Sequence, residues 1–136
     1  MVHTLSELYY TLEGQEERYY RVGDTRPPIC AALKRSDLVP ITMSNVTSIT
    51  FSMREYGNVY AIPKVNDQLC TIENSTYAQI CYYWGATDLS SVGAYEGQFT
   101  VYYNSTVFDG STLGTTETER FPTNIHLMIF VSESIV

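Results

Sequence analysis

Residues 89–99 read LSSVGAYEGQF, and this stretch decides the fold of the chain. A polar loop ends at Gly93, and Tyr95 stands where a strand of alternating side chains begins. In sandwiches of two β-sheets, a tyrosine at such a corner bonds through its hydroxyl to the backbone a few residues upstream. We therefore expect Tyr95 to have this structural role in an all-β protein.

Two positions after Tyr95 the chain has Gly97, where antibody domains carry one of their two disulfide-bonded cysteines. The sequence thus predicts an immunoglobulin-like antiparallel β-sandwich without the antibody disulfide. Residues 46–54 show the clearest alternation elsewhere, with apolar side chains on one face and hydroxyl side chains on the other. The predicted structural residues are Tyr95, Trp84, Phe51 and Phe99.

Strand-like stretches separated by turn signals run through most of the chain. Turns are predicted at residues 57–58, 66–67 and 73–76, where Gly, Asn, Asp and Ser gather. Residues 104–118 are rich in Ser, Thr and Gly, and they are expected to form either a long loop or an extended hairpin. The predicted strands cover residues 18–22, 29–34, 46–54, 59–63, 68–72, 77–84, 95–103 and 125–131.

The N-terminal residues are expected to differ from the rest. Thr4 and Glu7 have the spacing of a capping box, and Gly14 is a natural helix end. We therefore predict a short helix over residues 4–14, within an N-terminal arm of residues 1–17 that precedes one sandwich domain of residues 18–136. So short a helix is marginal alone and must dock on its own domain or on a partner. The predicted contact residues of the arm are Leu5, Leu8, Tyr9 and Leu12.

The composition narrows the class of protein. The chain has 136 residues, which suits one domain, and only 17% of them are charged. Its net charge is −7, and its eight basic residues are scattered, which argues against a nucleic-acid partner. The chain does not open with a basic region followed by an apolar run, and no apolar stretch reaches ~18 residues. We therefore expect neither a signal peptide nor membrane insertion.

Residues with catalytic or metal-binding chemistry are sparse. The two histidines, His3 and His126, are far apart in the sequence, and the three cysteines lack the spacing of a metal site. No nucleophile motif occurs. We expect no catalytic, cofactor-binding or metal-binding residues, and hence no enzyme. Cys30, Cys70 and Cys81 are interpreted as buried apolar residues, with a Cys70–Cys81 bridge as the alternative if those strands pair.

Tyrosine is unusually abundant, with 12 copies and four doublets. Because neighbours in a strand point to opposite faces, each strand doublet should place one ring inside and one outside. An outward tyrosine suits a protein interface, stacking on a sugar ring, or ordinary strand packing. The predicted interface residues in these doublets are Tyr19, Tyr83 and Tyr102, and the sequence leaves open which ring of each doublet is exposed.

Several motifs follow one another in a recognisable order. Residues 21–29 read RVGDTRPPI and precede the alternating strand at residues 46–54. A later strand ends in YYW at residues 82–84, the corner follows at residues 93–99, and a Phe-Pro pair at residues 121–122 precedes the last strand. This ordered set resembles the immunoglobulin-like N-terminal domain of the baseplate upper protein family of tailed bacteriophages.

The resemblance implies a non-enzymatic structural component of a tailed phage particle. We expect it to assemble with other phage structural proteins in the tail, baseplate or neck, as a homo-oligomer or in many copies of a symmetric assembly. Its expected location is the virion, assembled in the cytoplasm of the host bacterium. The alternative is a capsid-decoration or fibre-type module that binds host glycans by stacking exposed tyrosines and Trp84 on sugar rings.

Overall fold

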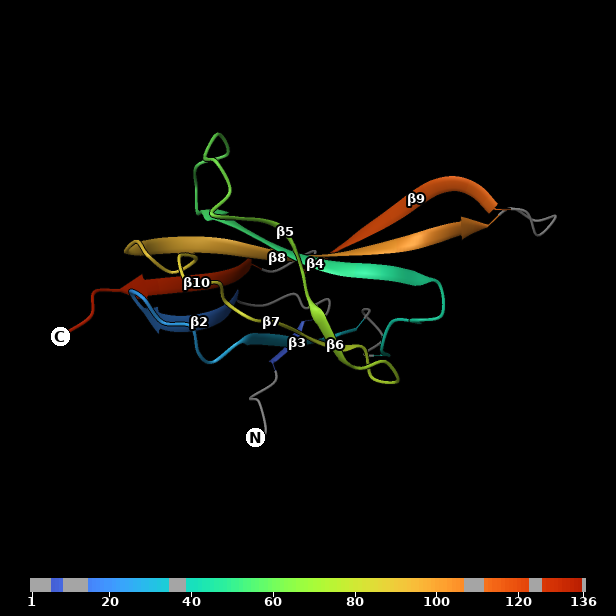
Figure 1. The fold of residues 1–136 in the computed structure, drawn as a ribbon, viewed down its shortest axis with the longest axis horizontal. Coiled ribbons are helices and arrows are strands. Elements are labelled where there is room, and N and C mark those ends of the chain that lie inside the picture. Colours follow the sequence, from blue (N-terminus) through green and yellow to red (C-terminus); the bar gives the residue numbers. More distant parts are fainter. Residues whose placement is uncertain (1–5, 9–14, 35–38, 107–111, 123–125, 136) are drawn as a thin grey trace.

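The computed structural model describes residues 6–8, 15–34, 39–106, 112–122 and 126–135, and within these ranges the regular structure is entirely β (Figure 1). The predicted all-β fold is therefore confirmed. The strands are β1 (Ser6–Leu8), β2 (Gln15–Arg21), β3 (Ile29–Leu33), β4 (Val46–Glu55), β5 (Val65–Leu69), β6 (Thr71–Asn74), β7 (Gln79–Tyr82), β8 (Gly93–Thr106), β9 (Thr112–Phe121) and β10 (His126–Ser132).

The strands form two sheets that lie as two layers (Figure 1). One sheet has the order β1-β3-β7-β6, and the other has the order β2-β10-β8-β4-β5, with β9 paired to β8. Most neighbours are antiparallel, as predicted, but β1 joins β3 and β2 joins β10 in parallel. The chain passes from the second sheet to the first at Cys70, between β5 and β6.

Apolar side chains from the two sheets meet in one core. Along β4, Ile49, Phe51 and Met53 are each at most 1% exposed, which confirms the predicted alternation. The Phe51 ring lies in the middle, with its centroid 5.1 Å from that of Phe99 and 5.6 Å from that of Trp84. Phe51, Phe99 and Trp84, which the sequence analysis named as structural residues, are all buried in this core.

Gly97 explains why the antibody disulfide has no counterpart in this core. A Cβ atom at residue 97 would lie 2.8 Å from Cδ1 of Ile129 and 2.9 Å from the Phe51 ring. Real Cβ atoms do not approach other atoms so closely. The aromatic ring and the isoleucine therefore occupy the space that a cysteine side chain would need.

The predicted N-terminal helix is wrong where the structure describes it. Ser6–Leu8 forms β1, in register with residues 31–33 at the edge of β3. A helix this short is marginally stable on its own in water. As a strand, the segment instead forms hydrogen bonds with the exposed backbone edge of β3. The predicted contacts Leu5, Tyr9 and Leu12 lie outside the described residues, as does the side chain of Leu8. β2 begins at Gln15 and so crosses the expected domain boundary.

One predicted strand and one predicted turn also need correction. Residues 59–63 form a loop with turns rather than a strand, because the chain leaves β4 through the turn at Gly57. Residues 66–67 lie within β5 rather than in a turn, although Asp67 has the left-handed φ of 53°. For residues 104–106 and 112–118, which the structure describes, the extended hairpin is the correct alternative, because β8 and β9 pair from Phe99–Phe121 to Thr106–Thr112 and extend away from the sandwich (Figure 1).

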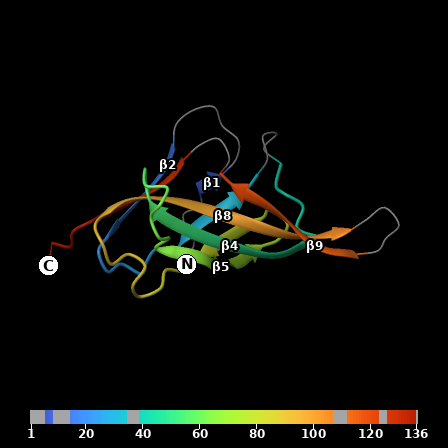
Figure 2. The same cartoon turned by 90° about the horizontal axis from the view of Figure 1, so that it is seen from above.

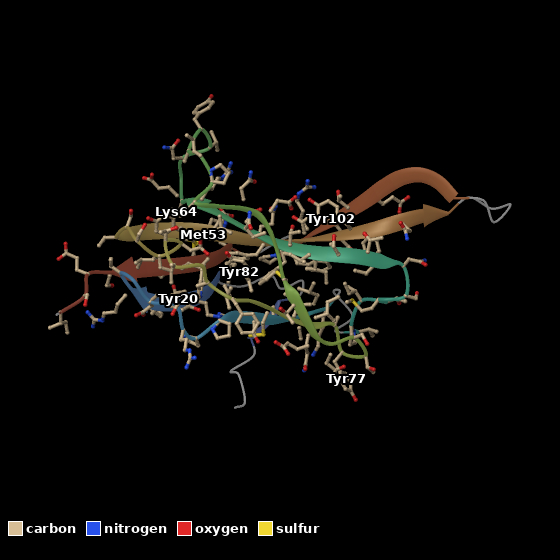
Figure 3. All side chains as sticks on the ribbon, in the orientation of Figure 1. Tyr20, Met53, Lys64, Tyr77, Tyr82 and Tyr102 are labelled. Atoms are coloured by element: carbon tan, nitrogen blue, oxygen red, sulfur yellow. A yellow bond between two sulfur atoms is a disulfide. The ribbon has the colours of Figure 1, made fainter. Side chains whose placement is uncertain are left out.

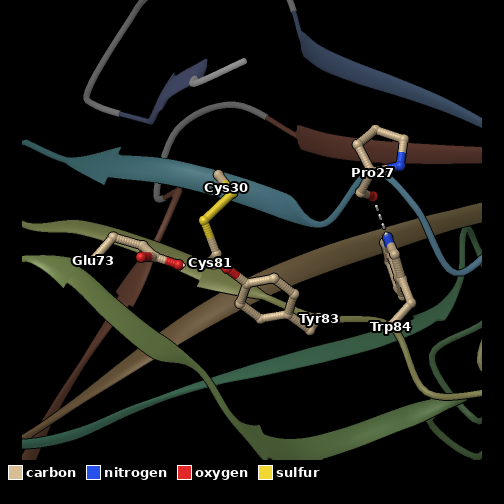
Figure 4. Close-up of a disulfide and its surroundings, with 6 residues drawn as sticks. All are labelled: Pro27, Cys30, Glu73, Cys81, Tyr83 and Trp84. Carbon is tan, nitrogen blue, oxygen red and sulfur yellow. Dashed lines mark hydrogen bonds between the residues drawn. A yellow bond between two sulfur atoms is a disulfide. The ribbon is translucent and has the colours of Figure 1, made fainter. Parts of the chain in front are cut away.

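The interpretation of all three cysteines as buried apolar residues is also wrong in part. Cys30 and Cys81 form a disulfide, and only Cys70 is a free buried thiol (Figure 4). The two bonded cysteines lie directly opposite each other in the antiparallel β3–β7 pair. The alternative Cys70–Cys81 bridge is excluded, since Cys81 is already bonded. This disulfide joins neighbours within one sheet, whereas the antibody disulfide joins two sheets.

Candidate interaction surface

The loop between β4 and β5 carries the densest group of exposed apolar side chains among the described residues. Tyr60 is 93% exposed and Ile62 is 91% exposed, and Val92 from the β7–β8 loop is 54% exposed beside them. In Figure 1 the loop, coloured green, rises from the end of β4 away from both layers. We call this set the apolar loop patch, and its members are Tyr56, Val59, Tyr60, Ile62 and Val92.

Hydrogen bonds hold the backbone of the loop at its tip and at both of its ends. Tyr56 N–H donates to the Ala94 carbonyl at 3.0 Å, and Lys64 N–H donates to the Met53 carbonyl at 2.7 Å. At the tip, the side-chain oxygen of Asn58 accepts from Tyr60 N–H at 3.1 Å. The loop therefore presents its apolar side chains from a defined backbone, which lowers the entropic cost of binding.

A groove of about 630 Å³ separates this loop from the β7–β8 loop. Ile62 and Val92 line it together with Tyr95, the predicted corner residue. The Tyr95 hydroxyl donates to the Ser91 carbonyl at 3.0 Å, so the predicted tyrosine-corner hydrogen bond is present. Lys64 Nζ donates to Ser90 Oγ at 2.7 Å and links the two walls. The feature that pointed to the fold thus also shapes one wall of the groove.

The outer face of the six-stranded sheet carries aromatic and charged side chains. Tyr19 stacks on Phe130 with ring centroids 5.4 Å apart and an interplanar angle of 19°. Farther along β10, His126 Nδ1 lies 2.9 Å from a carboxylate oxygen of Glu96. The imidazole also meets the Tyr56 ring edge-on at 5.7 Å, which connects this face to the apolar loop patch.

A second group on the same face is centred on Asp67. The Asp67 carboxylate accepts from the hydroxyl of Thr50 and from that of Tyr102, the latter at 2.7 Å. These two hydrogen bonds lower the pKa of Asp67, because they favour its charged form. The same bond to Asp67 raises the pKa of Tyr102. Tyr102 is half-buried, and its hydroxyl group already donates a hydrogen bond within the molecule.

On the four-stranded sheet, the outward side chains lie around the disulfide (Figure 4). Tyr83 is 48% exposed, and its hydroxyl donates to Glu73 Oε1 at 2.5 Å. Trp84 points into the molecule, where its indole N–H donates to the Pro27 carbonyl at 3.1 Å. Because Trp84 is only 6% exposed, its predicted alternative role in stacking on sugars is wrong.

The tyrosine doublets follow the predicted alternation in two of the three strand cases. Tyr19 and Tyr83 are exposed while Tyr20 and Tyr82 are buried, and Figure 3 places Tyr20 and Tyr82 between the layers. In the third doublet both rings are half-buried. Tyr19, Tyr83 and Tyr102 lie on separate parts of the surface, so the structure does not bring these three predicted interface residues together.

The apolar loop patch is a feature that the sequence analysis missed. Its residues were assigned to a strand at 59–63, where alternating apolar side chains would be half-buried. The signal that could have found them is the position of three large apolar residues, Val59, Tyr60 and Ile62, between the Gly57-Asn58 turn and Pro63. A turn before such a group and a proline after it favour a loop over a strand.

A metal cluster and a membrane-spanning helix are both absent from the described residues. These residues hold no group of three His, Cys, Asp or Glu side chains placed to bind a metal ion. Nor do they include a helix with the length and hydropathy of a membrane span. The expected absence of enzymatic activity stays a prediction.

Comparison with solved structures finds a similar fold in a phage protein. The N-terminal domain of phage TP901-1 ORF48 matches 94% of this chain and 96% of its own length, with a TM-score of 0.62. The sequence identity is 13%, so the likeness is one of fold. No protein-family model matches the chain, and no curated protein matches its sequence.

Proposed function

We propose that this chain is a non-enzymatic structural component of a tailed phage particle, an immunoglobulin-like module that joins other virion proteins in the tail, baseplate or neck. The observation that carries the proposal is the shared fold with a phage domain over nearly the whole of both chains. The ordered motifs described above point the same way. In this proposal several copies act in a symmetric assembly, and the protein is located in the virion.

The apolar loop patch is the surface on which a neighbouring virion protein would dock. Exposed apolar groups of this density mark interaction sites on soluble proteins. Burying a side chain such as that of Ile62 or Tyr60 would contribute roughly 1.5–3 kcal/mol before the costs of association. The fixed backbone of the loop keeps those costs low.

The test is incorporation into particles. A phage whose only copy of the gene carries Tyr60→Ser and Ile62→Ser should produce particles that lack the protein, because the main apolar contacts are removed. The matched control is Tyr77→Ser, which removes an exposed ring in the β6–β7 turn, at the opposite side of the molecule (Figure 3). Particle composition is measured by mass spectrometry and the position by electron microscopy.

Three outcomes separate the parts of the proposal. If particles contain the wild-type protein and the Tyr77→Ser control but not the loop variant, both the virion role and the docking surface are supported. Full incorporation of the loop variant would reject the docking surface alone. Absence of the wild-type protein from purified particles would reject the virion role itself.

A further inference from the structure

A polar pocket of about 280 Å³ lies on the outer face of the six-stranded sheet. Figure 2 looks onto this face, where β4 and β8 run side by side. Met53 and Gly97 of the two strands line the pocket, together with the prolines at residues 63 and 122. The pocket is distinct from the groove behind the apolar loop patch.

The strand register brings four polar side chains into this pocket. Ser52 lies opposite Gln98, and Arg54 lies opposite Glu96, in the antiparallel β4–β8 pair. All four point outward, because the residues that alternate with them, Met53 and Gly97, face the core. The pocket therefore presents a hydroxyl, a carboxamide, a guanidinium and a carboxylate within one small area.

Three of these groups are held in place by neighbours. Ser52 Oγ accepts from Asp67 N–H at 2.8 Å, which leaves its own hydroxyl proton to donate. Glu96 is positioned by His126, and a guanidinium nitrogen of Arg54 lies 3.4 Å from the Val59 carbonyl. The carboxamide of Gln98 makes no hydrogen bond within the described part of the chain, so it can both donate to and accept from a ligand.

The charges of the pocket select a neutral ligand. Arg54 disfavours a cation, and Glu96, in a protein of net charge −7, disfavours an anion. The volume equals that of roughly nine water molecules, which suits one small ring better than a peptide segment. Paired donors and acceptors on flat polar side chains match vicinal hydroxyl groups, and the prolines offer apolar contact to ring C–H groups.

We propose that this pocket binds one unit of a neutral saccharide through Ser52, Arg54, Glu96 and Gln98. The site is independent of the proposed docking surface and adds a second function to the module. The ligand is either a free sugar or one residue of a surface polysaccharide, since both present the same hydroxyl chemistry.

The experiment is an NMR titration of the full chain. Neutral methyl glycosides of hexoses and N-acetylhexosamines, and separately a neutral bacterial cell-wall polysaccharide, are added while backbone amide shifts are recorded. Concentrations up to about 100 mM glycoside fill even a site with a ~10 mM dissociation constant. We expect saturable shifts at the amides of residues 52–54 and 96–98. If the ligand is a free sugar, the glycosides produce these shifts; if it is one residue of a polymer, only the polysaccharide does.

Variants decide whether the named side chains are responsible. Gln98→Ala and Arg54→Met should each weaken binding at least fivefold, whereas Gln68→Ala, on exposed β5, should leave it unchanged. Two variants at different side chains guard against the failure of one to fold, and amide spectra verify the fold of each. No saturable shift at these amides with any probe, shifts confined to the apolar loop patch, or equal binding by all variants would overturn the proposal.

Discussion

Tyr95 closes the corner between the β7–β8 loop and β8 through its hydroxyl group. Burial, and to a lesser extent the charge of Glu55, raises the pKa of Tyr95, so the hydroxyl remains a donor at all ordinary pH values. Tyr95→Phe keeps the ring and removes the hydrogen bond to Ser91, and should lower the free energy of unfolding by about 1 kcal/mol. Urea denaturation measures this loss. Tyr60→Phe, at a fully exposed ring, is the control, and equal stability of the two variants would show that the corner bond contributes nothing.

The lowered pKa of Asp67 makes the free energy of unfolding depend on pH in the acidic range. Its pKa lies below the ordinary value of 3.8 in the folded state, so its charged form stabilises the fold above that value. The contribution is lost as the pH falls through the lowered pKa. Asp67→Asn, which also tolerates the left-handed φ, should therefore be less stable than wild type at pH 7 and equally stable near pH 2. The difference should stay below about 1 kcal/mol, because the carboxylate is exposed.

The measurement for Asp67 is a series of urea melts of both proteins between pH 2 and pH 7. Tyr102→Phe removes one of the two donors, so it should retain part of the pH dependence. A stability difference that is the same at every pH would contradict the assignment of this effect to the carboxylate charge.

Among the elements, β3 and β7 are joined covalently by the Cys30–Cys81 disulfide. The closed loop spans 51 residues, and such a bond stabilises a fold by about 2–4 kcal/mol. We expect the Cys30→Ala/Cys81→Ala variant to unfold at a lower urea concentration by that free energy. A reducing agent should shift wild type to the same midpoint and leave the variant unchanged. If reductant shifts both proteins equally, the bond is not the cause.

The elements also show what sequence patterns can and cannot predict. Alternation over residues 46–54 and 95–103 identified β4 and β8, because one face of each strand is buried in the core. The helix over residues 4–14 was wrong because capping signals are local, whereas the pairing of β1 with β3 is not. The disulfide was missed for the same reason. It depends on the register of two strands that lie 51 residues apart in the sequence.

At the scale of the whole molecule, the sequence predicted the architecture better than the surface. It correctly predicted that the doublets at residues 19–20 and 82–83 each place one ring inside and one outside, since neighbours along an extended chain point to opposite faces. It could not show that the outward rings lie apart, nor that residues 56–62 gather with Val92 into one patch, because both depend on how loops from distant segments meet. The polar pocket likewise exists only through the register of β4 and β8.

The disulfide also determines how the molecule would respond to mechanical pulling. Force applied at the two ends of the chain cannot extend the segment between Cys30 and Cys81 while the bond is intact. An extended residue spans up to about 3.6 Å, so the disulfide keeps about 180 Å of chain, over the 51-residue separation, from being extended. The oxidised protein should therefore lengthen by that much less than the reduced one when it unfolds under tension, so its redox state sets how far the chain can be extended.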